Sequence, residues 1–130
     1  MQAALSHLNN WLASGKAPPK GSPLQVIAGD PLKYSLDDNG HAKGGIRTPW
    51  VDVPTMRLSG VGGTGSLIAQ LVGSSEPFDD ATLKRLYPGG KNEYLKKFEG
   101  ALSSAISAGF ILPADKQEIL DLARVSYPAQ

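Results

Sequence analysis

Glycine and proline place the strongest constraint on how this chain can fold. The 130 residues include 15 glycines and 10 prolines, about a fifth of the chain. This share lies below the roughly 25–30% that is typical of low-complexity disordered segments, so we expect a folded chain with many turns. Most of these residues fall between positions 15 and 78, where little regular structure is predicted. A loop-rich stretch of that length argues against a self-contained compact domain, because its backbone N–H and C=O groups need partners. We therefore expect this stretch to lie across another body of protein.

Length, charge and composition exclude several classes of function. The length suits a single domain. Thirteen basic residues are interspersed with twelve acidic ones, and the formal net charge is +1, so no basic stripe for a nucleic acid is expected. No apolar run approaches the roughly 18 residues of a membrane span, and the first twelve residues do not resemble a signal peptide. Cysteine is absent, which excludes disulfides and thiolate chemistry but assigns no compartment.

Helices are predicted at the two ends of the chain, which we treat as one segment, 1–130. Residues 1–14 form the first helix, residues 15–78 are loop-rich with short strands, and residues 79–126 are helical. The first helix carries apolar side chains at helical spacing and ends before Gly15, which suits the residue after a helix. The expected apolar positions of this helix are Leu5, Leu8, Trp11 and Leu12.

Three helices are expected in the last third. The first is capped by Asp79 or Asp80 and ends at Tyr87, before a proline and two glycines. The second covers residues 93–108 and the third covers residues 115–124. Their expected inward-facing residues are Leu95, Phe98, Leu102 and Ile106 in the second helix, and Ile119, Leu122 and Ala123 in the third.

The middle of the chain offers only short extended segments. Residues 24–28 suit a short strand, and residues 32–36 and 41–47 suit a hairpin around Asn39–Gly40, a favoured turn dipeptide. The stretch "RTPWVDVP" is bracketed by two prolines, so we predict an extended edge or loop there.

A glycine motif in "SGVGGTGSLIAQLVG" resembles a dinucleotide-binding fingerprint. Gly60, Gly62 and Gly65 have the spacing G-x-G-x-x-G, and an apolar run follows. That fingerprint needs a buried parallel strand before the glycines and a full helix after them. Pro54 and Arg57 do not suit such a strand, and the apolar run lasts about two turns. We favour a flexible turn that enters a short buried segment, and expect no bound cofactor.

Other catalytic signals are weak. His7 and His41 are expected to be surface or capping histidines, and neither belongs to a cluster with metal-ligand spacing, so no metal is expected. The adjacent pairs Asp37–Asp38 and Asp79–Asp80 fit turn and cap chemistry better than general acid–base catalysis. No G-x-S-x-G nucleophile motif occurs, and no catalytic residue is assigned in this chain.

The stretch "GGIRTPWVDVP" is the best candidate for a binding site. Its two glycines permit close backbone approach or unusual dihedral angles. One hypothesis places Arg47 and Trp50 in a ligand cleft, where the guanidinium holds a carboxylate. The other has Trp50 in a core and Arg47 paired with Asp52 or with a backbone carbonyl.

A family resemblance becomes specific at the same place. "DDNGHAKGGIRTPWVDVP" resembles a block with the pattern D-x-x-G-N-x-x-G-G-I-R-x-P-x-V-x-V-P, which is found in a bacterial family of the α/β-hydrolase superfamily known only as an alpha/beta hydrolase domain. His41 stands where that pattern has asparagine. Three more blocks, "LNNWLASGKAPP", "LVGSSEPFDDATLKRLYP" and "YLKKFEGALSSAISAGFILPADKQEILDLA", are similar to the family's blocks in the same order.

The resemblance implies the C-terminal portion of an α/β-hydrolase fold. The serine nucleophile, the catalytic histidine and most of the sheet of such proteins are expected upstream, so this chain is expected not to be catalytic alone. The intact protein would hydrolyse a small carboxylic ester, and the partner of this chain would be the remainder of the domain or a second copy. The alternative is a small stand-alone binding or interaction protein.

Overall fold

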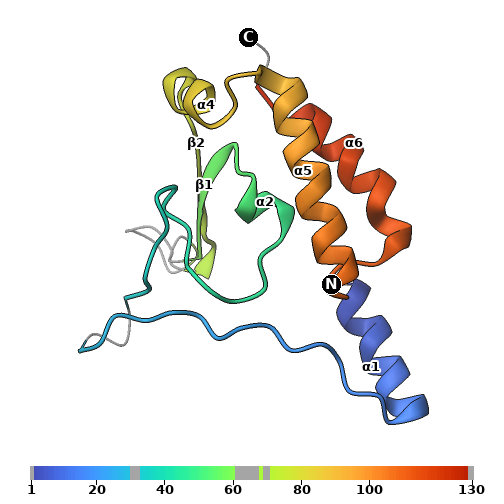
Figure 1. The fold of residues 1–130 in the computed structure, drawn as a ribbon. Coiled ribbons are helices and arrows are strands. Elements are labelled where there is room, and N and C mark those ends of the chain that lie inside the picture. Colours follow the sequence, from blue (N-terminus) through green and yellow to red (C-terminus); the bar gives the residue numbers. More distant parts are fainter. Residues whose placement is uncertain (1, 30–32, 61–67, 69–70, 129–130) are drawn as a thin grey trace.

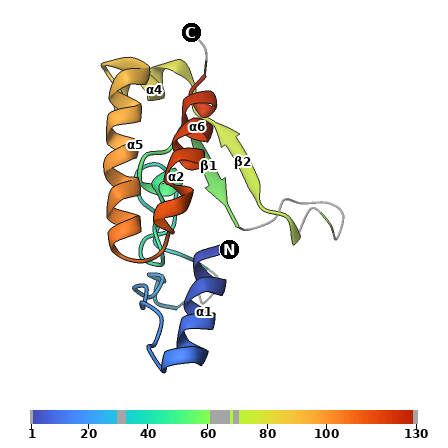
Figure 2. The same cartoon turned by 90° about the vertical axis from the view of Figure 1, so that its right-hand side faces the viewer.

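The structure of the chain is a computed structural model that describes residues 2–29, 33–60, 68 and 71–128. The described part is mainly helical with a few short strands, as expected from the sequence. In order the elements are α1 (Gln2–Ser14), α2 (Pro49–Asp52), β1 (Met56–Ser59), β2 (Ser74–Pro77), α4 (Asp80–Leu86), α5 (Gly90–Ser107), the 3₁₀ turn η1 (Pro113–Asp115) and α6 (Lys116–Ser126). The two C-terminal helices, α5 and α6, lie side by side, and α2, α4 and the strand pair lie on one flank of them (Figures 1 and 2).

The predicted helices are present, with bounds shifted by a few residues. Asp79 caps α4, because its carboxylate accepts the Thr82 N–H at 2.8 Å. α5 begins three residues earlier than expected, and α6 follows a 3₁₀ turn. Gly15 has a positive φ of 72° and donates its N–H to Trp11 O, as expected for the residue that ends α1.

The core is an aromatic cluster on one face of α5. Tyr94, Phe98 and Leu102 are completely buried. Tyr94 lies between the rings of Tyr87 and Tyr127, at centroid distances of 5.3 and 5.1 Å. Of the predicted inward residues of α6, Ala123 is buried and Ile119 packs against the cluster, but Leu122 is half exposed, so its prediction was wrong. α6 packs mainly against α5, so only a narrow stripe of its surface is buried, and Leu122 lies at the edge of that stripe.

α2 corrects the expectation of an extended "RTPWVDVP" stretch. Pro49 stands at the first helical position, where its missing N–H and fixed φ suit a helix start. The N–H groups of Val51 and Asp52 bond Thr48 O and close a single turn. The turn places Trp50 edge-on against Phe98 of α5, at a centroid distance of 4.7 Å. The two prolines therefore bracket a helical turn that joins the middle of the chain to the core.

β1 and β2 form an antiparallel pair in which Leu58 lies opposite Ser75. Two of the three motif glycines, Gly62 and Gly65, lie outside the described residues, and the segment between the two strands therefore has no structural account here. The order of the strands nevertheless bears on the motif. The strand before the glycines pairs antiparallel with the next strand in the sequence, whereas a dinucleotide site needs a parallel strand–helix–strand unit.

The described residues between 22 and 45 form isolated bridges rather than a regular sheet. The antiparallel bridge between Leu36 and Ala42 confirms the hairpin around Asn39–Gly40, and a second antiparallel bridge joins Val26 to Tyr34. Three backbone hydrogen bonds close a ring: Gln25 N–H donates to Lys43 O, Lys43 N–H to Ser35 O, and Ser35 N–H to Gln25 O. These bonds satisfy part of the backbone of the loop-rich stretch internally.

α1 buries little of its predicted apolar face. Among the described residues of this helix only Ala3 is buried, and four large apolar side chains are 44–78% exposed. α1 continues roughly in line with the lower end of α5 in Figure 1, and its half-buried His7 donates Nε2–H to Gly109 O at 2.6 Å. The exposed side chains are Leu5, Leu8, Trp11 and Leu12.

Candidate functional site

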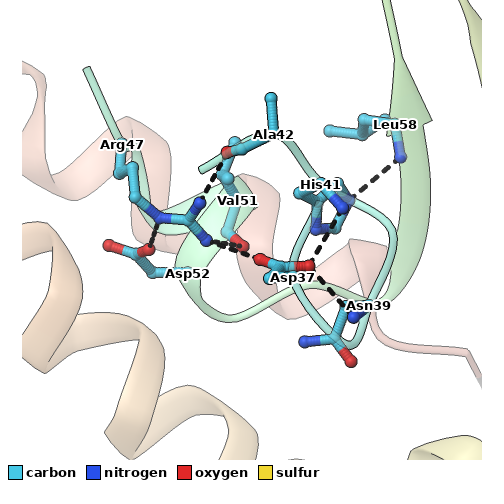
Figure 3. Close-up of polar contacts among 8 residues, drawn as sticks. All are labelled: Asp37, Asn39, His41, Ala42, Arg47, Val51, Asp52 and Leu58. Carbon is cyan, nitrogen blue, oxygen red and sulfur yellow. Dashed lines mark hydrogen bonds and ion pairs between the residues drawn. The ribbon is translucent and has the colours of Figure 1, made fainter. Parts of the chain in front are cut away.

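The candidate site is the polar network that surrounds Arg47, between the hairpin and α2 (Figure 3). The guanidinium donates Nη1–H to Ala42 O at 2.8 Å and Nη2–H to the Asp37 carboxylate at 2.9 Å. Its Nε–H bonds the Asp52 carboxylate, and Nη2 also lies 3.4 Å from Val51 O. We call these five residues the Arg47 cluster. Its fork-shaped cation joins the hairpin to the C-terminal end of α2.

The local sequence explains why the cluster forms. Asp37 Oδ1 accepts the N–H groups of Asn39 and His41, at 3.0 and 2.9 Å, which is the self-capping turn that aspartate favours. Its other oxygen is thereby directed to Arg47. Gly44 has a positive φ of 78°, and a Cβ on it would lie 2.1 Å from Pro23 O, so the hairpin needs glycine there.

The cluster pairs one cation with two carboxylates. Burial by itself would raise the pKa of Asp37, but the hydrogen bonds from His41, Arg47 and Asn39 outweigh it and lower that pKa below its ordinary value. Burial likewise opposes the charge of Arg47, and its bonds to Asp52 and Asp37 more than compensate, so its pKa is raised. Asp37 therefore remains ionised at neutral pH and Arg47 remains a cation.

The structure shows where each predicted residue lies. Arg47 makes the pairings with Asp52 and with a backbone carbonyl that one of the two hypotheses named. Trp50 lies half-buried against Phe98. The two side chains point to different neighbours, the guanidinium to the hairpin and the indole to α5. Contact of either with a substrate stays a prediction.

His41 corrects the expectation of a surface or capping histidine. It is 2% exposed, and its Nε2 accepts the Leu58 N–H of β1 at 3.0 Å. Sequence reasoning missed this role because the donor is a backbone group 17 residues further along the chain. The sequence signal that could have drawn attention to this position is that His41 stands where the family pattern has asparagine.

An open, mostly apolar cavity of about 770 Å³ lies beside the cluster. One wall is the hairpin, the opposite wall is the end of β1, and Lys33 and Ser59 supply polar atoms. This volume is within the usual range for a small-molecule pocket. The apolar side chains of the lining are Leu24, Ile27, Tyr34, Leu36, Ala42 and Leu58.

Metal-ligand clusters and membrane-spanning helices are both absent from the described residues. They contain no group of three or more His, Asp and Glu side chains placed to hold a metal ion. Within the same ranges, no helix has the length and apolar character needed to cross a membrane.

Comparison with known proteins gives one match. No curated protein and no solved structure matched the chain. The family model described as "Alpha/beta hydrolase domain" matches residues 1–121, which covers the whole hairpin, the Arg47 cluster, α5 and most of α6. The match agrees with the blocks that resemble this family in the sequence. The chain belongs to the alpha/beta hydrolase domain family.

Proposed function

We propose that the chain is the C-terminal, non-catalytic part of a carboxylic-ester hydrolase. The family match carries this proposal, together with the absence of a G-x-S-x-G motif from the 130 residues. In the acyl-transfer chemistry of serine hydrolases, a serine attacks the carbonyl and a histidine takes its proton. Both residues would come from the remainder of the domain. This chain would supply closing helices and one wall of the active-site mouth.

The exposed apolar side chains support the need for a second body. Soluble monomers rarely expose contiguous apolar patches of more than a few hundred square ångströms. Here α1 and the hairpin both present large apolar residues that are about half exposed or more. Those on the hairpin and its flanks are Leu24, Val26, Ile27, Tyr34, Leu36 and Ile46.

Within this proposal, Arg47 and Trp50 would contact the acyl or acid part of the substrate. The contacts of Arg47 favour an indirect role, because its Nε and both Nη atoms already bond protein acceptors. In the proposed intact hydrolase, Arg47→Ala should lower kcat/KM for several esters. An unchanged kcat/KM across the series would contradict any role in the site.

The isolated chain provides the direct test. Its hydrolysis of 4-nitrophenyl acetate should not exceed that of the same chain unfolded in urea. It should bind an apolar dye and self-associate in light scattering, whereas a variant with Leu5, Leu8 and Leu12 changed to Gln should do both less. Ester turnover by the folded chain would refute the non-catalytic assignment. A monodisperse, cooperatively unfolding monomer that binds no dye would instead favour a small stand-alone binding protein.

A further inference from the structure

His41 links two elements that are distant in the sequence. It follows the Asn39–Gly40 turn, and its imidazole Nε2 accepts the N–H of Leu58 in β1 (Figure 3). β1 pairs with β2 along its other edge, so this bond lies on the edge of β1 that faces the hairpin. The imidazole therefore satisfies a backbone donor that the small sheet leaves open.

The hydrogen bond fixes the protonation state of the ring. A backbone N–H points at Nε2, so Nε2 must present a lone pair, and the proton of the neutral ring sits on Nδ1. Nδ1 is buried and has no hydrogen-bond partner among the described residues. A protonated ring would have N–H groups on both nitrogens, and Nε2–H would then face the Leu58 N–H.

Charged groups of both signs surround the ring. Asp37 accepts the backbone N–H of His41, and its carboxylate attracts an imidazolium. That carboxylate is already paired with Arg47. Arg57 of β1 crosses the turn at Gly40 and pairs only at 3.5 Å with Glu76 of β2. Asp38, on the same turn, is exposed to solvent. Arg47 is also paired with Asp52, so both arginines have carboxylate partners, and Asp37 is the carboxylate that contacts His41 itself.

The bond also joins two segments that line the apolar cavity. Leu36, Gly40 and Ala42 line it from the hairpin, and Leu58 lines it from β1. His41 lies in the hairpin, between Gly40 and Ala42, and its Nε2 accepts the N–H of Leu58 in β1. Loss of the bond would release one wall from the other.

We propose that His41 is a proton-sensitive clasp that holds the hairpin against β1, and so holds together the two walls of the cavity. Histidine is the side chain whose charge ordinarily changes between pH 5 and 8. The neutral ring accepts the Leu58 N–H and keeps the walls together. Protonation replaces the acceptor by a donor, and the hairpin separates from β1. The clasp does not depend on whether the intact protein hydrolyses esters.

The test is amide exchange in the ¹⁵N-labelled chain. At pH 8 the nitrogen shifts of the His41 ring should show the proton on Nδ1. The protection factor of the Leu58 amide should fall at least tenfold when the pH is lowered from 8 to 5. The Phe78 amide, which donates to Thr55 O at 3.0 Å beside the same sheet, should keep its protection.

His41→Gln is the matched variant. A glutamine oxygen can reach the position of Nε2 and accept the same N–H, but it does not titrate. Leu58 protection in this variant should not depend on pH. The proposal is overturned by a proton on Nε2 at pH 8, by Leu58 protection that stays constant between pH 8 and pH 5, or by an equal pH response in the variant. Should the variant not fold, the ring shifts and the exchange of the unmodified chain decide.

Discussion

Arg47→Ala should destabilise the fold by about 2–3 kcal/mol. The guanidinium bond to Ala42 O is a charge-assisted hydrogen bond, a class worth about 1.5–3 kcal/mol. The two aspartate pairs are partly exposed, with side-chain exposures of 28% for Arg47, 22% for Asp37 and 43% for Asp52, so each adds only about 0–1 kcal/mol. Asp37 keeps its two backbone donors in the variant, which limits the cost of leaving it without its cation.

Urea unfolding followed by tryptophan fluorescence measures this change. Trp50 reports on α2, because Arg47 bonds Asp52 of the same helix. Trp11 of α1 is changed to Phe in all variants, so that the fluorescence comes from Trp50 alone. Arg124→Ala is the matched control, because Arg124 forms one exposed pair with Asp121 on α6 and should change stability by less than about 0.5 kcal/mol. Arg47→Lys should recover less than half of the loss, since an ammonium cannot reproduce the fork.

The slope of the urea transition decides how the result is read. An unchanged slope with a lower midpoint means that the cluster unfolds together with the core. A loss below about 0.5 kcal/mol at unchanged slope would refute the reasoning. Full recovery by lysine would also refute it, because charge rather than geometry would then hold the loop.

Three further results are expected from urea unfolding. Tyr94→Phe should leave the free energy of unfolding unchanged or raise it by up to about 1 kcal/mol, because the buried hydroxyl has no partner among the described residues. Tyr87→Phe should instead lower it by about 1 kcal/mol, because the Tyr87 hydroxyl donates a hydrogen bond to Pro54 O. Gly44→Ala should cost clearly more than Gly15→Ala, because both have positive φ but only the former meets a backbone oxygen. The lowered pKa of Asp37 contributes stability that is present above its ordinary value of 3.8 and lost as the pH falls through the lower folded value, so Asp37→Asn should flatten the fall in stability between pH 5 and 2.

The helices could be predicted because their signals are local. Apolar spacing, an aspartate cap and terminal glycines all act within a few residues, and α4, α5 and α6 follow them. Tyr94 of α5 is fully buried but was not predicted as a core residue, because the predicted apolar stripe of that helix began at Leu95. A stripe defines a face of the helix, and the neighbouring elements decide how wide that face becomes.

The strands and α2 could not be predicted from local signals. β2 has the sequence Ser-Ser-Glu-Pro and is exposed along its length, so it lacks the alternation that indicates a strand. It forms because β1 supplies its backbone partners. α2 depends on contacts of Arg47 and Trp50 that come from other elements. Of the Arg47 cluster, the pairing with Asp52 could be anticipated from proximity in the sequence, while Asp37 lies ten residues away across the hairpin.

The contacts of the middle of the chain form a continuous path from the core to the cavity. Phe98 of α5 holds Trp50, α2 holds Arg47 through Asp52, and Arg47 holds Asp37 at the base of the turn. The turn carries His41, which reaches β1. Each link is a short directional contact, so the position of the cavity wall is set by the helical core and not by the loop alone. This arrangement explains how a stretch rich in glycine and proline can present a defined surface. Its backbone is held at a few points by side chains, and the elements between those points need no regular structure of their own.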